Sequence, residues 1–166
     1  MREWFGLLAR LVTGGVWLAA GLLKLPDPAA SVRAVRAYDL LPESVVPAFG
    51  HTLPVLEVVL GACLVVGVLT RGAGLVSALL NLAFIVAIAS VWARGIEIEC
   101  GCFGGGGAKE GASSAYPWEI ARDAGLFLLS VYLVWSPRTR LALDNLIFRR
   151  PEGHDDVEEE RTVVQG

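Results

Sequence analysis

Four long apolar segments constrain the fold of this chain more than any other feature of its sequence. A helix that crosses a bilayer needs about 20 mostly apolar residues, and helices satisfy their own backbone hydrogen bonds inside the hydrocarbon. The four segments run from about Phe5 to Leu25, Thr52 to Leu69, Ala73 to Trp92 and Pro117 to Trp135. The sequence therefore predicts an all-α integral membrane protein built as a bundle of four transmembrane helices.

The composition supports a membrane protein and argues against a soluble domain. Of the 166 residues, 54% are hydrophobic and 19% are charged, whereas soluble domains carry roughly 25% charged residues. The length allows one domain, which we place at residues 1–150. Residues 151–166 are rich in acid and poor in apolar side chains, so we expect a disordered tail there. Membrane lipid is an expected partner of so apolar a chain. Nucleic acid is not an expected partner, because the body has no broad basic face.

The connections between the segments comprise one short turn and two long loops. Thr70-Arg71-Gly72 joins the second and third segments, which predicts a tight hairpin of antiparallel neighbours. In the first long connection, residues 31–40 mix apolar and charged side chains at helical spacing and predict a short amphipathic helix in the membrane interface. The second long connection, residues 93–116, carries two of the three cysteines.

The distribution of basic residues predicts the orientation in the membrane. One set of segment ends carries arginine throughout: Arg2, Arg10, Arg71, Arg138, Arg140, Arg149 and Arg150. The opposite set carries fewer basic residues: Lys24, Arg33, Arg36, Arg94 and Lys109. Basic residues favour the cytoplasmic side. We therefore expect both termini to lie in the cytoplasm and the cysteine loop to lie outside the plasma membrane, where disulfides persist.

The pair Cys100-Gly101-Cys102 is the strongest candidate for chemistry. Cysteines two positions apart can form a disulfide, but we expect so small a ring to pull their Cα atoms away from the usual separation of about 5.5 Å. A strained disulfide is more easily reduced, which suits thiol–disulfide exchange better than a structural role. Gly101 permits the backbone angles that ring closure needs. The following glycines, residues 104–107, would let the backbone of another protein come close.

Two other interpretations of the cysteines stay open. The pair could be structural or inert. It could also contribute to a metal site, for which His51 and Glu99 lie on the same side of the membrane. A structural zinc site usually takes four protein ligands, so this set is thin and we expect no metal. Cys63 lies in the middle of the second segment, where we expect a small packing residue.

Four ionisable residues within the segments form a second candidate site. Lys24 closes the first segment, Glu57 lies in the second, and Arg122 and Asp123 lie in the fourth. All four fall at a similar shallow depth on the cysteine side, and charges inside a membrane usually pair with one another. We expect Glu57 to pair with Arg122, and Asp123 with Lys24. The alternative is that Lys24 and Arg122 extend to the interface, which would leave the short carboxylate of Glu57 unexplained.

Four short motifs are distinctive: Gly21-Leu-Leu-Lys-Leu-Pro-Asp-Pro28, Pro54-x-x-Glu57 with Gly61, Cys100-Gly-Cys-Phe-Gly104 and Trp118-x-x-x-Arg122-Asp123. With these motifs the chain resembles the MauE family, which belongs with the DoxX-like four-helix membrane proteins. The resemblance covers about Leu7 to Leu133, and Cys-x-Cys-Phe-Gly is its most specific element.

The resemblance implies that Cys100 and Cys102 form a redox pair. It also implies a thioredoxin-like partner outside the membrane and a role in maturing a disulfide-rich protein of methylamine utilisation. We therefore expect a membrane thiol–disulfide exchange protein, a possible oxidoreductase. One alternative is a non-enzymatic membrane anchor for an oxidoreductase complex. Another is a protein that binds quinone or a different small molecule in the cluster of Lys24, Glu57, Arg122 and Asp123. Quinone is the one cofactor that this alternative would involve.

Overall fold

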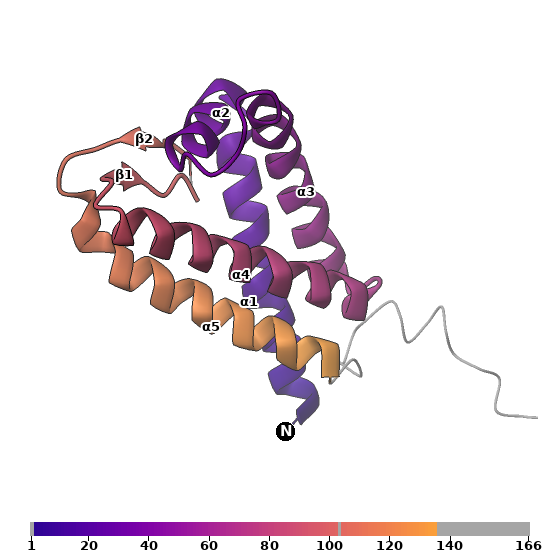
Figure 1. The fold of residues 1–166 in the computed structure, drawn as a ribbon. Helices are drawn as coiled ribbons and strands as arrows, with labels where there is room; N and C mark the ends of the chain where they lie inside the picture. Colours follow the sequence, from indigo (N-terminus) through magenta and orange to yellow (C-terminus); the bar gives the residue numbers. More distant parts are fainter. Residues whose placement is uncertain (1, 103, 136–166) are drawn as a thin grey trace, which may run out of the picture.

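The computed structural model describes residues 2–102 and 104–135 of the chain, which are mostly helical (Figure 1). The expected acidic tail, residues 151–166, lies outside the described residues. A short 3-10 helix, Ala112–Ala115, precedes the last helix. The α-helices of the described part are α1 (Arg2–Lys24), α2 (Pro28–Ala37), α3 (Val46–Val66), α4 (Thr70–Ala93) and α5 (Tyr116–Trp135).

Among the described helices, three are long and apolar enough to cross a membrane. These are α1 from Trp4 onward, α3 and α4. The helix α5 has 20 residues, but Glu119, Arg122 and Asp123 in its first half make it less apolar. The prediction of helices long and apolar enough to span a membrane is thus confirmed for three segments, and a fourth span through α5 stays a prediction.

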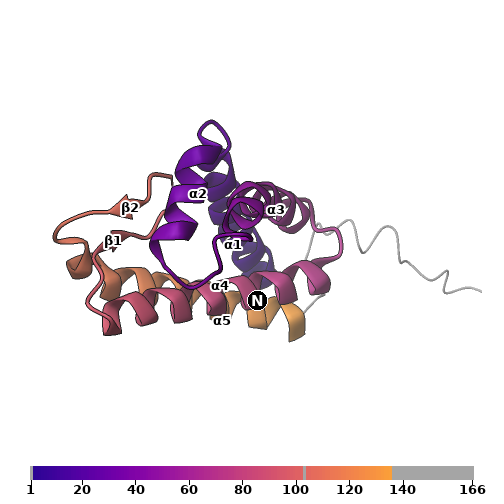
Figure 2. The same cartoon turned by 45° about the horizontal axis from the view of Figure 1, so that its top comes forward.

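The long helices form two packed pairs, α1 with α3 and α4 with α5 (Figure 1; Figure 2). The turn between α3 and α4 covers residues 67–69, three residues before the predicted turn, because Gly67 adopts a left-handed φ of 79° and ends α3. From this turn the two helices diverge, so the prediction of a close antiparallel hairpin is wrong. The reason is that α3 contacts α1 through glycines: a Cβ added to Gly61 would lie 2.8 Å from the carbonyl oxygen of Gly14.

The short helix α2 lies across one end of the bundle. Asp27 caps its N-terminus, where the carboxylate accepts a hydrogen bond from the Ala30 amide at 2.9 Å, and Pro28 opens the first turn. The helix ends at Ala37, before the predicted Leu40. Its buried face consists of Ala30, Ser31, Val32 and Ala34, and it packs on α3. The predicted amphipathic helix exists, and its buried face contacts protein; contact with lipid stays a prediction.

The loop between α4 and α5 contains a small antiparallel sheet that the all-α prediction missed. Its strands are β1 (Ile98–Glu99) and β2 (Gly107–Ala108). The buried hydroxyl of Tyr116 accepts a hydrogen bond from the Ile98 amide at 2.9 Å and donates to the carbonyl of Ile96 at 2.9 Å. This tyrosine therefore fastens the start of the cysteine loop to the end of the bundle.

Candidate functional site

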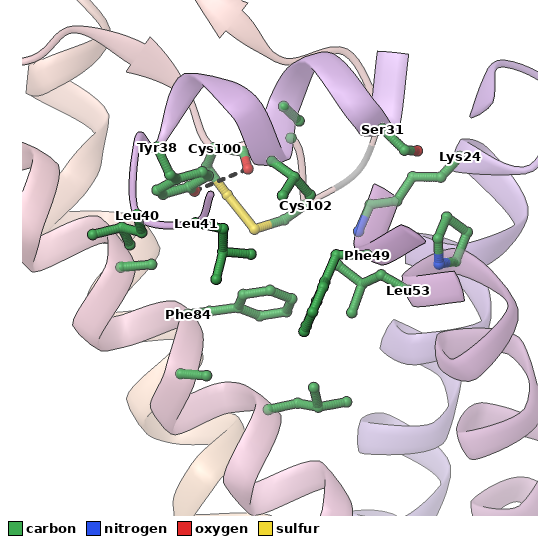
Figure 3. A pocket seen from close by; sticks show the side chains of 17 residues that line it. Lys24, Ser31, Tyr38, Leu40, Leu41, Phe49, Leu53, Phe84, Cys100 and Cys102 are labelled. Atoms are coloured by element: carbon green, nitrogen blue, oxygen red, sulfur yellow. Dashed lines mark hydrogen bonds between the residues drawn. A yellow bond between two sulfur atoms is a disulfide. The ribbon is translucent and has the colours of Figure 1, made fainter. Parts of the chain in front are cut away.

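Cys100 and Cys102 form a disulfide in the loop that passes along α2 (Figure 3). Their Cα atoms are 5.5 Å apart, which is a usual separation, so the predicted displacement of the Cα atoms is wrong. Gly101 reverses the chain between them with a left-handed φ of 69°. Cys100 is buried and Cys102 is half-buried. The two sulfurs are thus joined, and Cys102 is the more accessible residue of the pair.

The cysteine loop is held against α2 by one hydrogen bond and by close packing. The Tyr38 hydroxyl donates to the carbonyl oxygen of Cys100 at 3.0 Å (Figure 3). Burial raises the pKa of Tyr38, so the hydroxyl stays a neutral donor. A Cβ added to Gly101 would lie 2.7 Å from Ala34 Cβ, and one added to Gly106 only 2.4 Å from it. Gly101 and Gly106 therefore allow the loop to pack closely on α2, where a larger residue would collide with Ala34.

This contact predicts that Gly106→Ala loosens the cysteine loop. The added methyl group would lie 2.4 Å from Ala34 Cβ and 2.9 Å from its Cα, so α2 or the loop must shift. Such overpacking costs about 1–3 kcal/mol. We expect the Cys100–Cys102 disulfide of this variant to be reduced faster by added dithiothreitol, as followed by thiol alkylation and mass spectrometry.

Gly107→Ala is the matched control for this variant. Gly107 has a φ of 123°, close to the 117° of Gly106, so the backbone strain of alanine is similar at both positions. Among the described residues, nothing lies within 4 Å of a Cβ added to Gly107. Equal rates of disulfide reduction in the two variants would show that the contact with Ala34 does not hold the loop.

Lys24, Glu57, Arg122 and Asp123 lie toward the same end of the bundle, but their pairing differs from the prediction. Lys24 Nζ donates to Glu57 Oε1 at 2.6 Å, and both side chains are buried. Arg122 Nε donates to Asp123 Oδ1 at 2.9 Å. The predicted pairs, Glu57 with Arg122 and Asp123 with Lys24, are therefore wrong. The close contact of α1 with α3 at Gly21 brings Lys24 to Glu57, while Arg122 lies partly exposed on the flank of α5 and folds back on its neighbour.

A small cavity of about 20 Å³ separates these carboxylates from the disulfide. Glu57, Asp123, Asn81 and Cys102 all line it. Among the described residues, Glu57 Oε2 and Asp123 Oδ2 are buried and have no hydrogen-bond partner. A cavity of this volume has room for about one water molecule. Two acidic side chains thus lie around a space that also touches one sulfur-bearing residue of the candidate redox pair.

A buried network of polar side chains, which was not predicted from the sequence, joins α1, α4 and α5. Trp17 Nε1 donates to Ser77 Oγ at 2.7 Å, and Ser77 Oγ lies 2.7 Å from Ser130 Oγ. Ser130 also donates to the carbonyl of Leu126, and Asn81 donates to the carbonyl of Ser77. The two serines inside apolar segments were the available signal, but the sequence does not tell which helix faces each of them.

His51 and Glu99, the two other candidate metal ligands beside the cysteine pair, each take part in a separate local contact. His51 is exposed inside α3, where Nδ1 lies 2.6 Å from the carbonyl oxygen of Pro47. The Glu99 carboxylate accepts a hydrogen bond from Lys109 Nζ at 2.6 Å, which lowers its pKa. Cys63 is half-buried against the apolar core between the helices. Within the described ranges, no three His, Cys, Asp or Glu side chains gather as a metal site.

The apolar helices, the buried ion pair between them and the disulfide at one end define a helical membrane protein with a candidate redox site. A family model described as methylamine utilisation protein MauE matches residues 2–136. The chain therefore belongs to the MauE family, as its motifs predicted. Searches among curated proteins and among solved structures found no match.

Proposed function

We propose that this protein carries out thiol–disulfide exchange at the outer face of the plasma membrane, with Cys100 and Cys102 as the exchanging pair. The observation that carries this proposal is the disulfide between them, with Cys102 half-buried at the end of the helical bundle. Exchange proceeds through a mixed disulfide, so one sulfur must be reachable by a partner. Cys102 meets this requirement better than Cys100, which is 8% exposed.

The proposed partner is an extracytoplasmic thioredoxin-like protein with two thiols. Its first thiolate attacks the sulfur of Cys102, the bond between the two sulfurs breaks, and Cys100 leaves as a thiolate. The second thiolate of the partner then attacks the mixed disulfide and releases Cys102. Two electrons pass from the partner to the pair, and the partner leaves with a disulfide. Every step is reversible, so the relative potentials of the two proteins set the direction.

Trapping of the mixed disulfide tests this function. In Cys100→Ser, the accessible Cys102 thiolate can attack the disulfide of an oxidised partner, which is the reverse of the step above. No Cys100 thiol then remains to complete the exchange, so we expect this variant to accumulate a reducible adduct with the partner. Cys102→Ser leaves only the buried Cys100 and should give far less of this adduct. The measurement is non-reducing electrophoresis of membranes, followed by mass spectrometry of the adduct. Absence of an adduct in both variants, together with normal function of the double serine variant, would refute the exchange proposal.

A membrane anchor for an oxidoreductase complex is the second candidate function. It is favoured by the close packing of Gly101 and Gly106 against Ala34 and by the burial of Cys100, which suit a disulfide that only fixes the loop. In that case both serine variants would still bind the partner and support its activity. The trapping experiment therefore separates the two candidates.

The proposal includes four membrane spans, with α5 as the fourth, and both termini in the cytoplasm. The 20 residues of α5 suffice for a span, and its contact with α4 gives it a partner inside the membrane. We expect the reduced cysteine pair to react with a membrane-impermeant maleimide on intact cells, in a Cys63→Ala background that removes the remaining thiol. Labelling that requires broken cells would place the loop in the cytoplasm instead.

A further inference from the structure

A pocket of about 260 Å³ lies against the disulfide, between the diverging helices α3 and α4 (Figure 3). Both cysteines belong to its wall, and α2 and the cysteine loop border it. The rest of the lining is largely apolar and includes Phe49, Leu53, Leu80 and Phe84. The volume approaches the lower end of the usual range for small-molecule sites, about 300–1,000 Å³. The pocket is thus large enough for a small ring next to a redox-active bond.

Two buried polar side chains also line this apolar pocket. Lys24 reaches from the end of α1 toward it, with the ammonium group at the tip (Figure 3). The Lys24 ammonium carries three donor hydrogens, one of which serves Glu57. The Ser31 hydroxyl is buried and has no hydrogen-bond partner among the described residues. Leaving a buried polar group unpaired costs about 1–3 kcal/mol, so a ligand oxygen on this side would be stabilised.

The rim of the pocket reaches the protein surface through apolar side chains. Leu40, Leu41 and Phe49 line the pocket and are exposed. Because α3 and α4 are both apolar enough to cross a membrane, we expect an opening between them to face lipid rather than water. A ligand that enters here needs an apolar tail, and its head must carry oxygen acceptors for Lys24.

We propose that this pocket binds the head group of a lipophilic quinone and that the reduced pair Cys100–Cys102 passes its electrons to it. This inference rests on the proposed exchange function and names the acceptor that would reoxidise the pair. A quinone combines a flat ring, two carbonyl oxygens and an apolar tail. A lipid acyl chain would fill the same apolar space, but it would use neither the ammonium of Lys24 nor the disulfide in the wall.

The reaction balances without any further reactant. The two thiols of Cys100 and Cys102 lose two electrons and two protons, and a bond forms between their sulfurs. The two carbonyl oxygens of the quinone ring take up these electrons and protons and become hydroxyl groups, and the hydroquinone leaves. The small cavity lined by Glu57 and Asp123 touches Cys102 on another side and offers carboxylates that can hold a thiol proton in transit.

The test uses the purified full-length protein in lipid nanodiscs with its cysteine pair reduced. The probe is a short-chain benzoquinone. We expect one hydroquinone, measured by absorbance, for each disulfide, measured by the loss of alkylatable thiols. The initial rate should saturate with quinone concentration because the reaction occurs in a binding site. A rate that rises linearly without saturation would indicate attack on the cysteines from solution and would overturn the inference.

Two tryptophan substitutions on α4 test the position of the site. Ala87 lines the pocket, whereas Ala89 is exposed on the same helix outside the pocket lining. Ala87→Trp should fill the space and slow hydroquinone formation about tenfold or more, since overpacking a formed site is strongly unfavourable. Ala89→Trp should leave the rate close to that of the unmodified protein. Equal rates in both variants would exclude this pocket as the site.

Native mass spectrometry of the Cys100→Ser/Cys102→Ser protein provides a readout that is independent of turnover. The quinone probe should add its mass to this variant, and Ala87→Trp should prevent the addition. A phospholipid that stays bound and is not displaced by the probe would overturn the inference in favour of an acyl-chain site. Mixed-disulfide trapping with normal yield but no reaction with quinone would refute the quinone site alone. Hydroquinone formation without any trapped partner would refute protein exchange alone.

Discussion

Loss of the Lys24 charge is expected to destabilise the protein by about 3–5 kcal/mol, because it leaves the Glu57 carboxylate buried without its partner. The two side chains lie 2.6 Å apart and are 6% and 0% exposed. The second oxygen of Glu57 has no hydrogen-bond partner among the described residues, so nothing there replaces the ammonium. The change is Lys24→Met, which removes the charge and keeps an unbranched side chain one heavy atom shorter. The measurement is unfolding in detergent micelles followed by circular dichroism.

A double-mutant cycle separates the pair interaction from general damage. Lys24→Met combined with Glu57→Gln should cost less than the sum of the single changes, because the double variant no longer buries an uncompensated charge. Lys109→Met is the surface control. Its ion pair with Glu99 has the same distance of 2.6 Å, but the side chains are 60% and 45% exposed, so the expected loss is only about 0–1 kcal/mol. Additive losses at Lys24 and Glu57 would show that these residues do not stabilise each other.

The positions of the long helices could be predicted because apolar length alone indicates them, but their ends could not. The prediction started the second long helix at Thr52, whereas α3 starts at Val46. The residues in between include Pro47, which a helix tolerates in its first turn, and His51, whose ring bonds to its own helix. Thr52 Oγ1 donates to the carbonyl of Ala48 at 2.8 Å, and His51 contacts that of Pro47. Pro47, Gly50 and His51 interrupt the apolar pattern without ending the helix, so the pattern did not indicate its first residue.

The order in which the helices pack could not be predicted from the length of the connections. A turn of three residues suggested that α3 and α4 lie together, yet α3 lies along α1. The deciding feature is the set of glycines that face one another across α1 and α3, such as Gly14 and Gly61. The sequence shows these glycines but not their rotation about the helix axes, and Gly15 next to Gly14 faces open space.

The candidate site was predictable in its chemistry and not in its geometry. The Cys-x-Cys spacing indicated the disulfide, and helix rise placed Glu57 and Asp123 at a similar depth. The choice of ion-pair partners depended on which helices touch, which the sequence did not give. The pocket was missed for a different reason. Apolar residues such as Leu53 and Phe84 have the same spacing whether they fill a core or line a cavity, and Ser31 looked like an ordinary residue of an amphipathic helix.

The close approach of α1 and α3 at Gly61 predicts a large effect of adding one methyl group. A Cβ on Gly61 would lie 2.6 Å from the Leu18 amide nitrogen and 2.8 Å from the Gly14 carbonyl oxygen. Both atoms belong to the backbone of α1, so no side-chain rotation relieves the contact and the helices must move apart. We expect Gly61→Ala to lower the free energy of unfolding by about 1–3 kcal/mol, although alanine favours a helix over glycine by about 1 kcal/mol.

Gly15→Ala is the control, because among the described residues nothing lies within 4 Å of a Cβ added there. It should leave stability unchanged or raise it by up to about 1 kcal/mol through helix propensity alone. Gly61 lies one turn after Glu57, so a separation of the helices at Gly61 also draws the carboxylate away from Lys24. Gly61→Ala should therefore lower the free energy of unfolding less in the Lys24→Met/Glu57→Gln background than in the unmodified protein. The same unfolding experiment measures both losses. If Gly61→Ala and Gly15→Ala were equally stable, close backbone contact could not be what pairs α1 with α3 and holds Lys24 against Glu57.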